Sequence, residues 1–134
     1  MGEILCVTRL PKLILDTERI QQVFINLMTN AVQAMPNGGE LHIRARLQQG
    51  ENSNGSCLTI EFQDTGVGIN EEDQKRLFEP LFTTKSKGTG LGLAISAGIV
   101  NAHGGKIEFS SLIRQGSTFI VSLPVKVENE AGQL

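Results

Sequence analysis

The sequence lacks three features that define large classes of proteins. It has only two cysteines, Cys6 and Cys57, too few for a disulfide framework, so we expect reduced thiols and a cytoplasmic location. It has no apolar run of membrane-spanning length and no N-terminal signal core, which predicts a soluble chain without direct membrane insertion. Its formal net charge is −2, so it offers no basic field, and we expect no nucleic-acid partner.

Two common phosphate-binding motifs are absent as well. No G-x-x-x-x-G-K-[ST] loop occurs, and the glycine-spaced run 88–92 is followed by Leu93, where the dinucleotide motif needs its third glycine. The segment 78–93 nevertheless joins a lysine-bearing turn to glycines that open directly into a helix. Glycines let backbone N–H groups approach anionic oxygens, a helix start adds oriented donors, and Lys85 and Lys87 add full charges. The segment therefore predicts a nucleotide site of a third kind.

The chain of 134 residues is long enough for one domain, expected over 1–126, with a polar tail over 127–134. Periodicity and turn residues predict helices over about 17–35, 70–78 and 91–102, and strands over about 13–15, 41–47, 58–62, 106–111 and 117–123. The apolar stripe of the first helix comprises Ile20, Val23, Phe24, Leu27, Met28, Ala31, Val32 and Met35. That of the last helix comprises Leu91, Ala94, Ile95, Gly98, Ile99 and Ala102. This order predicts an α/β (α+β) two-layer sandwich, with a mixed, mostly antiparallel sheet packed on one face by three helices.

Four motifs then occur in order along the chain. They are Asn26-Leu-Met-Thr-Asn30-Ala31, Asp64-Thr-Gly66-Val-Gly68, Phe78-Glu-Pro-Leu-Phe82-Thr-Thr-Lys85 and Gly88-Thr-Gly90-Leu-Gly92-Leu93. Together they resemble the ATP-binding catalytic domain of two-component sensor histidine kinases, a branch of the GHKL group that also contains gyrase, MutL and the heat-shock chaperone ATPases. The resemblance covers nearly the whole chain, about 13–124, and implies binding of ATP and Mg²⁺ beneath an ATP lid loop.

Asn26 and Asn30 lie one helical turn apart, off the apolar stripe of the first helix. An isolated pair of this kind is most simply two solvated helix residues, but Mg²⁺ on a triphosphate needs only one or two protein oxygens. The resemblance implies that Asn30 is a metal ligand, with Asn26 beside it in the metal and catalytic site. Hydrolytic members of the group carry Glu in place of Asn26 to activate water, and an amide cannot accept a proton at neutral pH. The resemblance therefore implies transfer of phosphate to another acceptor.

Asp64 stands before glycines at a strand end, a common place for an Asp-initiated turn. The resemblance implies that its carboxylate accepts the amino group of adenine with support from Thr118, and that Lys85 is a catalytic residue near the phosphates. From the residues alone, Thr118 is an ordinary strand residue and Lys85 a solvated loop charge. The nucleotide-binding set implied by the resemblance is Asn30, Gln33, Asp64, Gly66, Gly68, Ile69, Phe82, Thr83, Thr84, Lys85, Gly88, Thr89, Gly90, Leu91, Gly92, Leu93 and Thr118. Gln33 and Ala34 replace a Lys and an aromatic residue that many members carry, which lowers the affinity we expect.

Kinases of this family phosphorylate a histidine on a separate helical domain. Of the two histidines here, His42 lies in a predicted strand and His103 at a predicted helix end, and we interpret both as structural or surface residues. The expected partners are a dimerisation and phosphoacceptor domain upstream in a longer protein and the receiver domain of a response regulator. The isolated domain is expected to be monomeric and the full-length kinase homodimeric. The alternatives are a GHKL module that phosphorylates a protein serine and a non-catalytic ATP-sensing module.

Overall fold

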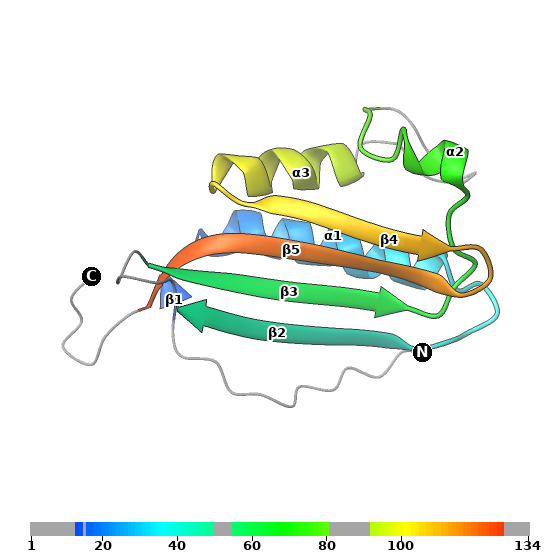
Figure 1. Ribbon diagram of the computed structural model, residues 1–134, viewed down its shortest axis with the longest axis horizontal. Helices are drawn as coiled ribbons and strands as arrows, with labels where there is room; N and C mark the ends of the chain where they lie inside the picture. Colours follow the sequence, from blue (N-terminus) through cyan, green and yellow to red (C-terminus); the bar gives the residue numbers. More distant parts are fainter. Residues whose placement is uncertain (1–12, 15, 50–54, 81–91, 128–134) are drawn as a thin grey trace.

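The computed structural model of the chain describes residues 13–14, 16–49, 55–80 and 92–127 (Figure 1). In chain order the elements are β1 (Leu13–Ile14), α1 (Thr17–Gln33), β2 (Leu41–Gln49), β3 (Ser56–Asp64), α2 (Glu71–Gln74), α3 (Gly92–Ala102), β4 (Lys106–Leu112) and β5 (Gly116–Val127). The order is the predicted one. Most of the predicted ATP lid loop falls in residues 81–91, outside the described residues.

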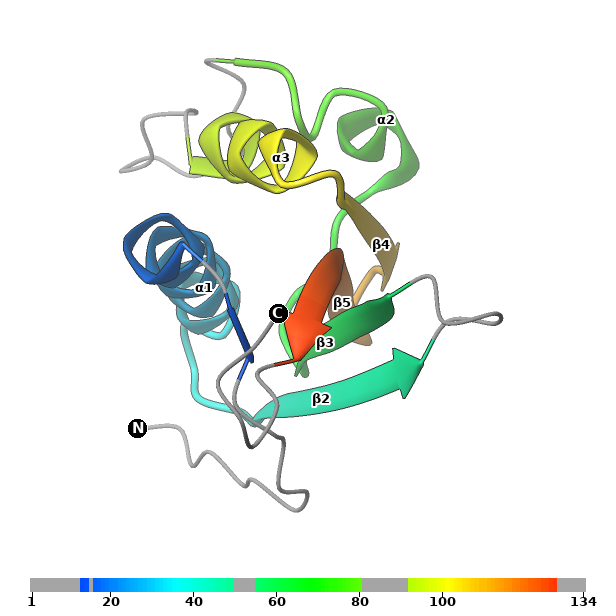
Figure 2. The same ribbon diagram turned by 90° about the vertical axis from the view of Figure 1, so that its left-hand side faces the viewer.

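The strands form an antiparallel sheet in which β5 occupies a central position. One edge of β5 pairs with β3, and the other pairs with β4 and, at the end of the strand, with β1. β2 pairs with the free edge of β3, so β2 and β3 form the predicted hairpin. Every pairing among the described strands is antiparallel, although the sequence predicts a mixed, mostly antiparallel sheet. Figure 2 shows α1 and α3 on the same side of the sheet, which confirms the two-layer sandwich.

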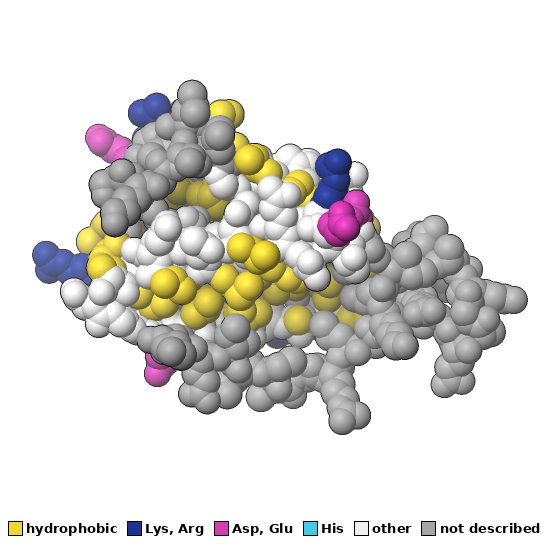
Figure 3. Space-filling model, turned by 180° about the vertical axis from the view of Figure 1, so that it is seen from behind, with side chains coloured by type: hydrophobic (Ala, Val, Ile, Leu, Met, Phe, Trp, Pro, Cys, Tyr) yellow, Lys and Arg dark blue, Asp and Glu magenta, His cyan; other side chains and the backbone are white. Residues whose placement is uncertain are grey.

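α1 forms where the sequence predicts it because its cap and its apolar period agree. Asp16 is the N-cap, and its Oδ1 accepts a hydrogen bond from Arg19 N at 3.4 Å. The buried residues of α1 all belong to the predicted stripe: Ile20, Val23, Leu27 and Ala31. Val32 does not follow the prediction, because it lies about 100° around the helix from Ala31 and is 59% exposed. Figure 3 views the side of the molecule that carries α1 and shows hydrophobic side chains in a band across its middle.

α3 buries a different face from the predicted one. Ile99 of the predicted stripe is buried, but Ile95 is 41% exposed, and Ser96 and Val100 from outside the stripe are buried with Ile99. The helix carries apolar residues on nearly every side, so the sequence offers little contrast from which its buried face can be identified. The helix itself lies within the predicted range.

α2 is shorter than the helix predicted over 70–78. Asn70 is its N-cap, since its Oδ1 accepts from Asp73 N at 2.8 Å. Beyond Gln74, the hydrogen bonds reach back three residues, as from Arg76 N to Asp73 O at 3.0 Å. The chain therefore continues as tight turns to Pro80.

The core lies between the helices and the inner face of the sheet. Alternate residues of β3 and β5 enter it, namely Leu58, Ile60, Phe62, Phe119, Val121, Leu123 and Val125. The ring of Phe62 packs on that of Phe24 from α1 with centroids 5.7 Å apart. β5 extends through Val127, one residue beyond the predicted domain boundary. Within the described ranges, no helix is long and apolar enough to cross a membrane.

Candidate functional site

Asp64 ends β3 on the face of the sheet that carries the helices. Its side chain is in phase with the buried residues of that strand and is itself only 4% exposed. Its Oδ1 accepts from Gly66 N at 2.9 Å and from Ser117 N at 3.2 Å. The first bond makes the Asp-initiated turn, and the second joins that turn to β5. A carboxylate offers about four acceptor positions, so these two bonds use only part of its accepting ability.

The glycine turn that follows β3 is held against the end of α1. Val67 N donates to Ala34 O, at the C-cap of the helix, over 2.9 Å. A Cβ at Gly66 would lie 2.3 Å from the same Ala34 oxygen, so this close approach requires glycine. Gly68 has a φ of +76°, and a Cβ there would lie 2.2 Å from Leu112 O in β4. Gly66 and Gly68 of the predicted nucleotide site are therefore required by backbone packing.

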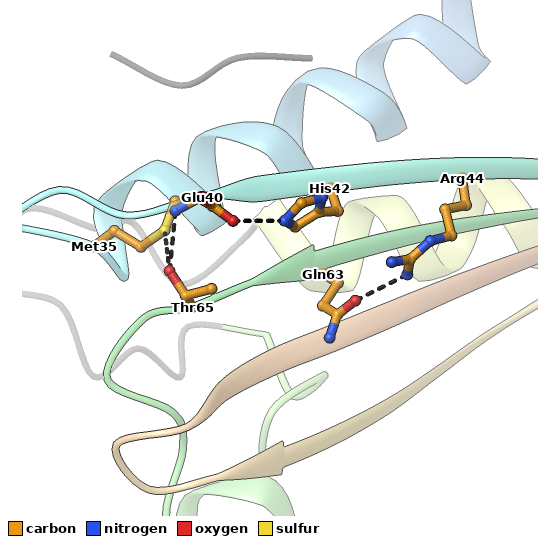
Figure 4. Close-up of polar contacts among 6 residues, drawn as sticks. All are labelled: Met35, Glu40, His42, Arg44, Gln63 and Thr65. Atoms are coloured by element: carbon orange, nitrogen blue, oxygen red, sulfur yellow. Dashed lines mark hydrogen bonds and ion pairs between the residues drawn. The ribbon is translucent and has the colours of Figure 1, made fainter. Parts of the chain in front are cut away.

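Thr65 ties the same turn to the segment that follows α1 (Figure 4). Its Oγ1 accepts from Glu40 N at 3.0 Å and donates to Met35 Sδ at 3.6 Å. Its backbone N donates to Glu40 O at 3.2 Å. The turn is thus attached to the chain on both sides of the connection between α1 and β2.

On the opposite side, the turn is fixed by polar side chains that the sequence analysis did not single out. Ile69 N donates to Ser111 Oγ in β4 at 2.7 Å. The side-chain amide of Gln74 donates to Ile69 O at 2.7 Å and to Ser111 O at 3.2 Å. Ser111 Oγ also lies 2.7 Å from Ser117 Oγ. These bonds connect the turn, α2 and the β4–β5 hairpin into one polar network.

The sequence analysis predicted that Thr118 supports Asp64, but in the structure the bond to Asp64 comes from Ser117. Ser117 and Phe119 are buried on the helix side of β5, whereas Thr118 alternates to the other face and pairs with Gln63. The signal was present in the sequence, because Ser117 is in phase with the apolar residues of β5 and Thr118 is out of phase.

Asn26, Asn30 and Gln33 form a row along one side of α1, at helical spacing i, i+4 and i+7. Asn26 Nδ2 donates to Gly92 O at 3.3 Å and to Ser96 Oγ at 3.1 Å, so this side of α1 faces the start of α3. Asn26 and Asn30 are half-buried, and Gln33 is exposed at the end of the helix. The C-terminal half of α1 thus carries the amide row, and the helix ends against the Asp64 turn.

Eight of the predicted site residues lie outside the described residues: Phe82, Thr83, Thr84, Lys85, Gly88, Thr89, Gly90 and Leu91. Gly92 and Leu93 follow directly and begin α3, and the Leu93 side chain packs against the core. The described part of the site therefore comprises the amide row, the Asp64 turn and the first turn of α3.

The donor chemistry of these residues fits an adenine nucleotide with its magnesium ion. Asp64 is a buried acceptor at a turn, which suits the amino donor of adenine. Asn26 and Asn30 carry amide oxygens one helical turn apart, and Mg²⁺ prefers oxygen ligands and takes few of them from the protein. Both hydrogen bonds of the Asn26 side chain to the described part of the chain use its nitrogen, so Oδ1 accepts no bond from those residues.

Comparison with known families agrees with this site. The family model described as "Histidine kinase-, DNA gyrase B-, and HSP90-like ATPase" matches residues 15–127. The match takes in every described helix and all the described strands except β1. The chain belongs to this family of ATP-binding domains.

The relatives narrow the assignment to the histidine-kinase type of ATP-binding catalytic domain. The signal transduction histidine-protein kinase AtoS of Escherichia coli (strain K12) is 44% identical over 110 residues, which are 82% of this chain and 17% of AtoS. Sporulation kinase E of Bacillus subtilis (strain 168) is 36% identical over 121 residues, 90% of this chain and 16% of that kinase. The structure of full-length ShkA in complex with AMPPNP superposes with a TM-score of 0.77 at 27% identity, covering 94% of this chain and 26% of ShkA. The chain thus spans about a sixth of the length of these curated relatives.

Proposed function

We propose that this domain binds Mg-ATP and donates the γ-phosphoryl group to a histidine on a separate dimerisation and phosphoacceptor domain. The observation that carries the proposal is the spacing along α1 between the amide row and the Asp64 turn, which meets the C-cap of the helix. The helix rises about 1.5 Å per residue, so Asn26 and Asn30 lie about 12 and 6 Å along its axis from Ala34, which touches the Asp64 turn. An extended nucleoside triphosphate spans a length of this order, with its base at one end and its phosphates at the other.

In the proposed complex, adenine lies at Asp64 and the phosphates lie toward the amide row and the first turn of α3. Gly66 N and Ser117 N hold the carboxylate of Asp64 in place, so that it can accept the amino group without reorganising. Lys85 and the glycines before α3 complete the phosphate site in this proposal. When bound, Mg²⁺ supplies positive charge that offsets the charge of the triphosphate.

The presence of an amide at Asn26 is evidence for phosphoryl transfer to an acceptor and against hydrolysis of ATP. Its amide donates to Gly92 O and Ser96 Oγ, whereas a Glu at this position would place carboxylate oxygens against the Gly92 carbonyl. An amide also cannot remove a proton from an attacking water. The proposed nucleophile is therefore an imidazole nitrogen, which forms a bond to the γ-phosphorus as the bond to the β–γ bridging oxygen breaks and ADP leaves.

The test is incubation of the domain with Mg²⁺ and ATP labelled at the γ-phosphate, with and without the histidine-bearing helical domain of the full-length protein. We expect no label on this chain alone and a base-stable, acid-labile label on the helical domain. Substitution of the acceptor histidine by Gln should abolish that label. Acid-stable label would instead indicate a serine kinase, and ATP binding without any transfer would indicate an ATP sensor.

A matched pair of variants links the transfer to the amide row. Asn30→Ala should weaken Mg-ATP far more than ATP in EDTA, because it removes a proposed metal oxygen, and it should slow transfer. Gln48→Ala removes an exposed amide from β2, away from the site, and should change neither. Equal losses of affinity with and without the metal in Asn30→Ala would contradict a role of Asn30 at the metal.

A further inference from the structure

Ser96 is a completely buried polar residue whose position in α3 is not explained by helix formation. Its exposed fraction is 0%, and its buried neighbours on the same helix, Ile99 and Val100, are apolar. Serine is a poorer helix former than alanine, because its hydroxyl competes for backbone hydrogen bonds. A buried hydroxyl is normally retained for a hydrogen bond, and here the bond is the one that Ser96 Oγ accepts from Asn26 Nδ2.

The two bonds made by Asn26 Nδ2 define which way its amide group faces. An amide nitrogen has two N–H donors, and here one acceptor is Gly92 O and the other is Ser96 Oγ. The reverse orientation would put Oδ1 against Gly92 O, where two acceptors repel. The nitrogen end of the amide therefore faces α3, and Oδ1 faces away from the two α3 acceptors.

We propose that Ser96 is a positioning residue, which holds the Asn26 amide so that Oδ1 is presented to the magnesium ion of Mg-ATP. This inference rests on the proposed function. A single bond to Gly92 O would leave the terminal torsion of Asn26 free to turn, because that torsion has a broad energy profile. The second bond, to a side chain that is itself fixed in the core, removes this freedom. It also links the amide directly to the first turns of α3.

The experiment compares Ser96→Ala with the wild-type chain by titration calorimetry, using Mg-ATP and, separately, ATP in EDTA. Alanine suits the helix and removes only the hydroxyl, so we expect a folded variant. Loss of one hydrogen bond should lower the affinity for Mg-ATP by about three- to ten-fold and leave metal-free ATP within about two-fold. In an Asn26→Ala background, Ser96→Ala should cause no further loss, because the group that it positions is gone. Ser96→Thr keeps the hydroxyl and should restore the affinity for Mg-ATP.

Val100→Ala is the control for a purely structural effect. Val100 is fully buried on the same helix, one turn beyond Ser96, and has no polar group that could bind Asn26. This variant should lower the stability of the fold yet leave the ratio of the two affinities unchanged.

A measurement without nucleotide separates the positioning role of Ser96 from the proposed function of the domain. In NMR spectra, Ser96→Ala should shift the side-chain amide signals of Asn26, and Val100→Ala should not. If these signals do not respond to Ser96→Ala, or if that variant keeps the wild-type ratio of affinities, the positioning role is overturned while the proposed function stands. A wild-type chain that binds ATP equally well with and without Mg²⁺ would overturn the metal site itself, and with it the role of Ser96.

Discussion

Asp64→Asn converts one end of a buried carboxylate into an NH₂ group and removes its negative charge. In the structure, Oδ1 accepts from Gly66 N at 2.9 Å and from Ser117 N at 3.2 Å, and an Asn oxygen in the same place can accept both bonds. The other end of the side chain becomes a donor and would face the amino donor of adenine. A buried pair left unmatched costs about 1–3 kcal/mol, which corresponds to a loss of roughly five- to hundred-fold in affinity for ATP.

Base specificity gives the same substitution a second readout. Guanine has a carbonyl where adenine has its amino group, so Asp64 should make the wild type prefer ATP to GTP by roughly ten- to hundred-fold. Asp64→Asn should lose most of this preference. The assay is competition of a fluorescent ATP analogue by ATP and by GTP, with circular dichroism and urea unfolding as controls for the fold. A folded Asn variant that retains the wild-type preference for ATP would refute the assignment of Asp64 to adenine.

Asp64→Ala should differ from Asp64→Asn in its effect on the free energy of unfolding. It leaves Gly66 N and Ser117 N without the Oδ1 acceptor in a buried place, at a cost of about 1–3 kcal/mol for each N–H. The free energy of unfolding should therefore fall in Asp64→Ala and change little in Asp64→Asn. Equal destabilisation by both substitutions would mean that the carboxylate charge, and not its hydrogen bonding, holds the turn.

Two further substitutions test the geometry of the site. Gly66→Ala should lower the free energy of unfolding in urea by about 1–3 kcal/mol, because its Cβ would lie 2.3 Å from Ala34 O. Gly98→Ala places its Cβ where nothing lies within 4 Å, so it should stabilise α3 by up to about 1 kcal/mol. Similar effects of the two substitutions would argue against the close approach at Gly66. Thr118→Val should change the affinity for ATP by less than about two-fold in the same competition assay, because Thr118 lies on the face of the sheet opposite to Asp64; a large loss would return Thr118 to the adenine site.

The elements that the sequence predicted well are those with two agreeing local signals. α1 has both an N-cap and an apolar stripe, and the hairpins have alternating strands joined by turn residues. For α3 the only local signal is its apolar composition, because the helix carries apolar residues on nearly every side. Its buried face is therefore decided by the helix and strands that it packs on. α2 ends early where its hydrogen bonds change to a three-residue spacing, a change that no residue type marks.

Some residues of the candidate site could be predicted from the sequence, and others could not. Asp64, Asn26 and Asn30 follow from the resemblance, and their placement depends on elements that the sequence predicts. Ser96 and Ser111 were missed, because their roles depend on partners from other elements brought together only by the fold. Ser117 was missed although its phase with the apolar residues of β5 indicates that it is buried. Serine is also common at exposed positions, so its type alone gives no signal of burial.

The central place of β5 in the sheet has a consequence for the synthesis of the chain. β5 is the last described strand to leave the ribosome, yet β1, β3 and β4 all pair with it, and Leu13 pairs with Val127 across nearly the whole described chain. Until residues 116–127 emerge, β3 and β4 each present an open edge, and the residues that β5 brings to the core are missing. Pairings between such distant segments form slowly. The nascent domain therefore lacks the centre of its sheet until residues 116–127 are made, and in that interval its unpaired strand edges and apolar residues favour aggregation.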